Sequence, residues 1–175
     1  MYRVSQFFRA LAAWVPKREL SLLSEYLTPP QVELFQRMPR CDQRHGLDVF
    51  YALQRKQQHD RDLLVAALLH DAGKSEGRLR LWHRVLIVLI RAVGAPLLDR
   101  LALSEPRSWR YPFFVHQQHP ELGAELAQAT GCSLVTVELI RRHQEPSAGN
   151  PFRTHQDKLL AALQEADGVN SGGNE

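Results

Sequence analysis

Residues Leu63–Lys74 read LLVAALLHDAGK: seven consecutive apolar residues lead directly into His70 and Asp71. The apolar run predicts a helix over 61–71. Two adjacent ionisable side chains at the end of so apolar a helix need partners, because burying an unpaired charge is energetically costly. We therefore expect other segments of the chain to bring complementary groups to His70 and Asp71.

The hydrophobic periodicity is helical along nearly the whole chain, and no alternation typical of β-strands reaches a useful length. Thr28 before two prolines, Ser133 and Thr154 are residues preferred at helix N-termini. The predicted helices are 3–14, 18–26, 29–38, 45–57, 61–71, 79–92, 97–103, 120–131, 134–143 and 154–168. The predicted irregular segments are loops at 104–118 and 147–153 and a disordered tail at 169–175. The predicted fold class is all-α.

The composition is that of an ordinary folded chain: 44% of the 175 residues are apolar, 23% are charged, and the net charge is +3. A chain of this size can form one domain with its own core. The mild positive charge suits an anionic substrate and gives no strong signal for nucleic-acid binding. Cys41 and Cys132 form no paired motif, and the N-terminus has no secretory cleavage pattern, so we expect a cytoplasmic protein.

The most apolar run, VLIVLI at 85–90, is far shorter than the ~20 residues that span a membrane, so no transmembrane span is expected. Arg80, Arg84 and Arg91 follow one face of the predicted helix 79–92 at spacings of four and seven. The stripe has two interpretations. The helix could make a peripheral contact with an anionic membrane surface. Its apolar side could instead pack on the protein while the arginines face solvent, which is the more usual outcome.

Several predicted helices direct a metal-ligand type of side chain toward the interior. His45, His70, His143 and Asp167 each lie three, four or seven positions from apolar residues of their own helix, which places them on its inward face. His119 stands immediately before Pro120, at the predicted helix start. Together with Asp71, these residues supply four imidazoles and two carboxylates. Such a nitrogen and oxygen ligand set would suit one or two divalent ions such as Fe, Mn or Zn.

The remaining histidines receive other interpretations. His59–Asp60 is a second HD dipeptide, but it lies in the polar stretch RKQQHDRD and is predicted to be a solvated surface pair. His116 is an alternative to His119, which we prefer because the helix start fixes its position. His83 and His155 lack an inward stripe and are predicted to be surface residues.

The order H…HD…H…H…D resembles the HD superfamily of metal-dependent phosphohydrolases. The matching segments are RHGLDVFYAL, ALLHDAGK, HPELGAELA, IRRHQE and LQEADG. The resemblance implies a helical bundle around a metal site, in a single domain over 1–168 with its core at 45–168. Residues 1–40 would form an N-terminal helical extension, and residues about 79–118 an insertion that shapes or covers the pocket.

The resemblance also implies a ligand set. The simplest family members bind one ion through the residues that correspond to His45, His70, Asp71 and Asp167. The additional His119 and His143 are similar to those of a two-metal subgroup, in which Asp71 would bridge both ions. The expected cofactor is therefore two divalent ions, Fe or Mn first, with Mg, Co, Ni or Zn as alternatives.

Within that subgroup the chain departs from the HD-GYP phosphodiesterases. The usual pair of adjacent histidines is His143–Gln144 here, and the GYP tripeptide is replaced by GNPF at 149–152. A cyclic-di-GMP substrate is therefore not implied.

The implied function is hydrolysis of a phosphomonoester or phosphodiester, a nucleotide or cyclic nucleotide, by metal-activated water. Asp71 would be catalytic as the bridging ligand. Lys74 would contact the phosphate or the leaving oxygen, and Arg44 would be a second substrate contact; the alternative for Lys74 is a solvated surface residue. Two other functions stay open: a di-iron oxygenase on the same scaffold, and a non-catalytic module that binds a nucleotide. The sequence does not indicate an oligomeric state.

Overall fold

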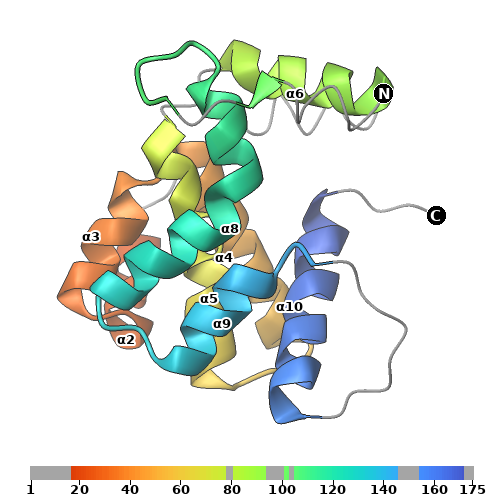
Figure 1. Ribbon diagram of the computed structural model, residues 1–175. Coiled ribbons are helices and arrows are strands. Elements are labelled where there is room, and N and C mark those ends of the chain that lie inside the picture. The colour runs from red at the N-terminus through yellow and green to blue at the C-terminus, as the bar shows by residue number, and fades with distance from the viewer. Residues whose placement is uncertain (1–16, 78–80, 94–100, 103–104, 146–153, 172–175) are drawn as a thin grey trace.

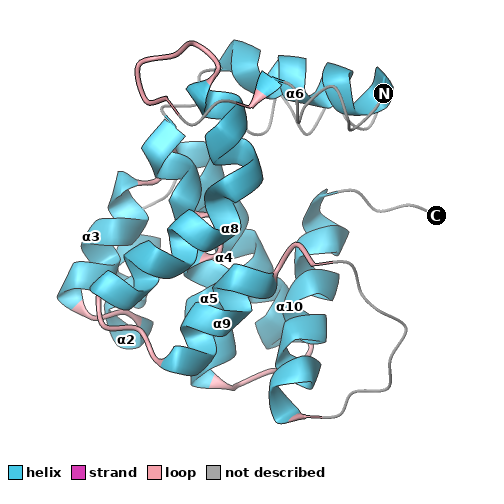
Figure 2. Cartoon of the chain, in the orientation of Figure 1, coloured by secondary structure: helices cyan, strands magenta, loops and turns pink. Residues whose placement is uncertain are grey.

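The computed structural model describes residues 17–77, 81–93, 101–102, 105–145 and 154–171 (Figure 1). All regular structure within these residues is helical, which confirms the all-α class (Figure 2). The elements are α2 (Lys17–Tyr26), α3 (Pro29–Arg37), α4 (Arg40–Arg55), α5 (Arg61–Leu69), the 3-10 helix η1 (Ala72–Gly77), α6 (Leu81–Val93), α8 (Tyr111–Ala129), α9 (Leu134–Arg142) and α10 (His155–Ser171). The predicted helix over 3–14, most of the one over 97–103 and the predicted loop over 147–153 lie outside the described residues.

Helix starts follow the capping residues read from the sequence. The Thr28 amide donates to Gln31 Oε1 at 3.0 Å at the start of α3. The Ser133 side chain accepts from the Thr136 amide at the start of α9. Thr154 and Asp157 each accept a hydrogen bond from the other's amide before α10, which satisfies donors that have no partner within the helix. These local signals confirm the predicted starts of three helices.

The predicted loop over 104–118 is wrong in its second half. α8 begins at Tyr111 and continues through Pro120 to Ala129, so His119 lies in the middle of a helix rather than at its N-cap. Pro112 occupies the first turn, where a missing N–H costs little. An interior proline usually breaks or kinks a helix. Here Phe113 and Val115 before Pro120 and Ala124 after it are buried, so α8 is embedded in the protein on both sides of the proline along the chain.

The predicted end of the last helix at Gly168 is also wrong, because α10 continues to Ser171. The first residues of the predicted disordered tail are therefore helical, and residues 172–175 lie outside the described part of the chain. A glycine near a helix end costs only about 1 kcal/mol, so Gly168 does not have to terminate α10.

The central element of the bundle is α5. Every residue from Leu63 to Leu69 is buried, as expected for a helix that is apolar on all sides. α4, α9 and α10 pack around α5, and α8 lies across α9 and η1 (Figure 1). Leu23, Leu34 and Phe35 of the N-terminal helices belong to the same buried cluster. The apolar half of LLVAALLHDAGK thus fills the core, and its polar half emerges at the end of α5.

Two glycines allow main chains to approach closely beside the polar half. A Cβ on Gly46 in α4 would lie 2.9 Å from the Leu68 carbonyl oxygen of α5. A Cβ on Gly73 in η1 would overlap the His119 carbonyl of α8. Since His45 adjoins Gly46 and Asp71 lies two residues before Gly73, these contacts bring α4, α5, η1 and α8 together at one place.

α6 lies apart from the main core, across one end of the bundle (Figure 1). Ile87 and Ile90 on α6 form a separate small cluster with Phe113 at the start of α8. None of the helices that the structure describes has the length and apolarity needed to cross a bilayer.

Candidate metal centre

All six residues predicted as metal ligands come together, from five helices and the turn after α5. His45 lies in α4, His119 in α8 and Asp167 in α10. His70 and His143 are the C-caps of α5 and α9. The ligand atoms form two sets of three, each with all atoms within 4.8 Å of one another. We refer to His45, His70 and Asp167 as the His45 group, and to Asp71, His119 and His143 as the His119 group.

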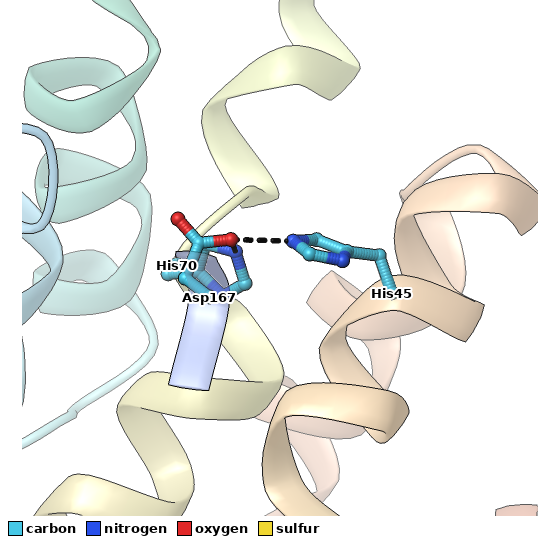
Figure 3. Close-up of side chains that lie close together, drawn as sticks. All are labelled: His45, His70 and Asp167. Carbon is cyan, nitrogen blue, oxygen red and sulfur yellow. Dashed lines mark hydrogen bonds and ion pairs between the residues drawn. The ribbon is translucent and has the colours of Figure 1, made fainter. Parts of the chain in front are cut away.

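In the His45 group, an imidazole and a carboxylate are already hydrogen-bonded. His45 Nε2 donates to Asp167 Oδ1 at 2.8 Å, and His70 Nε2 lies 3.9 Å from the same oxygen (Figure 3). The side chains of His45 and Asp167 are 23% and 21% exposed, whereas that of His70 is 1% exposed. This group therefore forms the solvent-facing side of the centre.

The His119 group is buried, and Asp71 connects it to the first group. Asp71 Oδ1 lies 3.4 Å from His119 Nε2, while Oδ2 lies 3.7 Å from His70 Nε2. The two oxygens of one carboxylate thus face two different imidazoles, one in each group. The four rings form a row His45–His70–His143–His119, with neighbouring centroids 5.2, 5.1 and 5.2 Å apart. The two groups are therefore halves of one centre.

Main-chain carbonyls orient three of the imidazoles. The Nδ1 atoms of His70, His119 and His143 lie 2.9, 2.7 and 2.6 Å from the carbonyl oxygens three residues earlier. A carbonyl only accepts, so each Nδ1 carries the proton, and in the neutral ring each Nε2 presents a lone pair. The carbonyls of Ala67 and Ile140 are available because they lie in the last turns of α5 and α9.

The third carbonyl is available because of Pro120. In an uninterrupted α-helix the amide of residue 120 would donate to the His116 carbonyl, but proline has no N–H. His119 Nδ1 donates to that carbonyl instead. Sequence reasoning missed this role of Pro120. A signal was present, since a proline inside a helix releases the carbonyl four residues earlier.

The Nε2 atoms of His70, His119 and His143 are buried without a hydrogen-bond partner. His119 Nε2, which presents a lone pair in the neutral ring, faces the carboxylate oxygen Asp71 Oδ1 at 3.4 Å. Buried acceptors that face one another need a cation between them. Ligands of one transition-metal ion, each about 2.0–2.2 Å from it, lie about 3–4 Å apart. The residues present therefore fit divalent ions of the nitrogen- and oxygen-binding type.

Burial and neighbouring charges shift the pKa values of this centre in both directions. Burial, followed by the charge of His70, lowers the pKa of His143 to about 3, and burial also lowers the pKa of His70. Burial opposes ionisation of the carboxyls, but Lys74 and His70 hold the pKa of Asp71 well below its usual range. The pKa of Asp167 is also lowered, against its burial, by the hydrogen bond from His45. Burial lowers the pKa of His45, but the hydrogen bond to Asp167 together with the charges of Asp71 and Asp167 raises it overall.

The two residues predicted to contact substrate differ in position. Lys74 Nζ lies 2.7 Å from Asp71 Oδ2 with its side chain 16% exposed, so its ammonium belongs to the centre. The Arg44 guanidinium is ion-paired with Glu19 and Asp48, each at 2.8 Å. These two carboxylates already neutralise the charge of Arg44, and its predicted substrate role stays a prediction.

The other histidines lie outside the two groups. Asp60 of the second HD dipeptide caps α5 through the Leu63 amide, and its other oxygen lies 3.4 Å from the exposed His155. The prediction that His155 lies at the surface is confirmed. The prediction for His83 is wrong: its side chain is buried, with its ring 5.9 Å from that of Phe113. Its partner could not be foreseen, because Phe113 was assigned to a loop.

A family model for the HD domain matches residues 43–170, which include all six ligand candidates. The chain belongs to the HD-domain superfamily. Membership in this superfamily of metal-dependent phosphohydrolases implies that the HD domain binds a divalent metal. Comparison with curated proteins and with solved structures gives no significant match. The identity and number of ions and the substrate therefore rest on the centre itself.

Proposed function

We propose that this HD domain hydrolyses a phosphomonoester or phosphodiester, of a nucleotide or a cyclic nucleotide, with two divalent ions. The observation that carries the proposal is the position of Asp71, which belongs to the His119 group and also faces His70 of the His45 group. One oxygen of Asp71 faces His119, and the other faces His70. A one-ion site would need only one of these oxygens.

In this proposal the His45 group holds one ion, the His119 group holds the second, and Asp71 is shared. Such ions neutralise phosphate charge and lower the pKa of water, which supplies the nucleophile for hydrolysis. Three main-chain carbonyls fix the tautomers of His70, His119 and His143. Losing one of these hydrogen bonds would weaken metal binding, because the partner that orients a metal-binding imidazole also supports its affinity.

The substrate approaches from the side of His45, Asp167 and Lys74, because these three side chains are partly exposed. The Asp71, His119 and His143 side chains lie behind them, at most 3% exposed. Lys74 Nζ donates to Asp71 Oδ2, and its positive charge at this position would attract a phosphate oxygen that lies beside Asp71. Lys74 therefore binds the transferred phosphoryl group and favours anionic substrates.

The test combines metal analysis with a substrate panel. The full chain, loaded separately with Mn²⁺ and with Fe²⁺, is assayed for phosphate release from a chromogenic phosphomonoester, a chromogenic phosphodiester, nucleotides and cyclic nucleotides. We expect about two ions per chain and hydrolysis that is lost on chelation and restored by the metal. Turnover that survives chelation, or metal-loaded protein that consumes dioxygen but releases no phosphate from any substrate, would contradict the proposal.

A further inference from the structure

Exposed apolar side chains are concentrated at one end of this molecule. Among the described residues, five large hydrophobic side chains are exposed: Trp82, Val85, Leu89, Trp109 and Leu134. Three of the five lie on α6, and Trp109 lies in the turn before α8. A single exposed leucine such as Leu134 needs no explanation, but a cluster of large apolar side chains indicates an interaction surface.

The exposed residues of α6 share one face. Val85 follows Trp82 by three positions, and Leu89 follows Val85 by four, so the three side chains form a stripe along the helix. Ile87 and Ile90 belong to the opposite side and pack on Phe113 of α8. One apolar face of α6 thus holds the helix on the bundle, and the second is exposed, with Leu89 58% exposed.

Trp109 extends the stripe beyond α6. Trp82 and Trp109 line the same cavity of about 680 Å³, so they lie on the same side of the protein. The Trp109 ring packs edge-on against Phe113 at 6.2 Å, which connects this turn to the cluster under α6. Trp109 is nevertheless 61% exposed. We call Trp82, Val85, Leu89 and Trp109 the α6 patch.

The charge of the segment indicates what kind of partner fits. Between Glu76 and Asp99 the chain has four arginines, at positions 78, 80, 84 and 91, and no acidic residue. Exposed tryptophans with aliphatic residues and neighbouring arginines are the composition of helices that lie in the interface of an anionic bilayer. A protein partner held by apolar contact alone would not require a segment whose charged residues are all arginines.

We propose that the α6 patch binds the surface of membranes that contain anionic phospholipids, with α6 in the plane of the interface. This inference is separate from the proposed hydrolysis. The centre lies deeper in the bundle: His119 follows Tyr111 by eight residues of α8, about 12 Å along the helix axis.

The test is sedimentation of the full chain with vesicles of phosphatidylcholine alone and with vesicles containing phosphatidylglycerol. We expect binding to the anionic vesicles that weakens as salt is raised. Leu89→Glu should weaken it by about tenfold or more, because a charge replaces the most exposed aliphatic side chain of the patch. Leu134→Glu is the matched control, since Leu134 is 79% exposed on α9, away from the patch, and should bind like wild type.

A second variant tests the charge contribution independently of α6 packing. An arginine near an anionic surface strengthens binding by about fivefold, so Arg84→Gln with Arg91→Gln should weaken it by about 25-fold. Circular dichroism checks that each variant folds. The proposal is overturned if wild type does not sediment with anionic vesicles, or if neither variant weakens binding. It is equally overturned if light scattering shows a dimer that Leu89→Glu dissociates while vesicles are not bound, because the patch would then join two copies.

Discussion

The two halves of the centre satisfy their polar atoms in different ways. In the His45 group, His45 and Asp167 form a 2.8 Å hydrogen bond at the solvent-facing side. In the His119 group, the Nε2 atoms of His119 and His143 are buried without a hydrogen-bond partner. Metal binding at His45 and Asp167 would have to displace a proton from their hydrogen bond, whereas both imidazoles of the second half already present lone pairs. The buried half is therefore the better preorganised ligand set.

The largest expected effect comes from the residue that joins the halves. Asp71→Asn removes the charge that both groups share, so we expect loss of both ions and a fall in turnover of about a thousandfold, equivalent to about 4 kcal/mol of transition-state stabilisation. Metal content and turnover measure this directly. Asp60→Asn is the matched control: the amide oxygen can still cap α5, and activity should stay near wild type. If Asp60→Asn were inactive and Asp71→Asn active, the choice of His70–Asp71 as the functional HD dipeptide would be wrong.

Removing one imidazole of the buried half should abolish metal binding in that half and leave the other half intact. His119→Ala or His143→Ala should leave a folded protein with about one ion, held by the His45 group and Asp71, and turnover lowered by about a hundredfold. Metal stoichiometry, circular dichroism and turnover are measured together. His116→Ala serves as control, since it keeps the carbonyl that accepts from His119. Unchanged stoichiometry and turnover in both variants would make these histidines structural.

Pro120→Ala tests the orientation of the buried half without touching a ligand. The alanine restores an N–H that competes with His119 Nδ1 for the His116 carbonyl, so metal affinity should fall by about tenfold. The helix itself should become more stable, because an interior proline costs about 3 kcal/mol. Titration with Mn²⁺ and thermal melting measure the two effects. Pro112→Ala, in the first turn of α8, should leave affinity unchanged; equal affinities for all three proteins would remove the proposed role of Pro120.

The last prediction is a pH dependence of stability that differs between His143 and His45. The pKa of His143 is about 3 in the folded protein and about 6.5 in the unfolded chain, so only the unfolded state gains this proton as pH falls from 6.5 toward 4. After chelation, protonation of His143 in the unfolded chain should therefore lower the free energy of unfolding by about 1.4 kcal/mol for each unit by which the pH falls in this window. The pKa of His45 is raised, so His45 is protonated in both states there and adds no slope. Denaturant unfolding at several pH values measures how the free energy of unfolding depends on pH. This dependence should be weaker in His143→Gln and unchanged in His45→Gln.

The positions of the ligand candidates were predictable from the sequence because helical periodicity places them on inward faces. His45, His70, His143 and Asp167 each follow or precede apolar residues at helical spacing, and the structure brings all four to the centre. His119 was predicted for the wrong reason, since a helix start at Pro120 was assumed where α8 continues. Proline is ambiguous in a sequence: its local cost favours a helix start, and only tertiary packing shows that the helix persists.

What the sequence did not show depends on contacts between segments far apart in the chain. His83 is buried against Phe113, thirty residues later, and no local pattern of α6 predicts that partner. The Arg44 pair with Glu19 likewise joins α4 to α2. The two interpretations of the apolar helix 79–92 were packing and membrane contact. The packing is confirmed, since Ile87 and Ile90 form a cluster with Phe113, and the membrane contact stays a prediction.

The contact at Gly73 has a consequence for the dimensions of the centre. Asp71 and His119 belong to two main chains that touch, because Gly73 has no side chain to separate η1 from α8. A gap set by side chains can widen when rotamers change, but a gap set by touching backbones cannot. Gly73 therefore sets the distance between the main-chain segments that carry Asp71 and His119, and a larger residue at position 73 would push η1 away from α8.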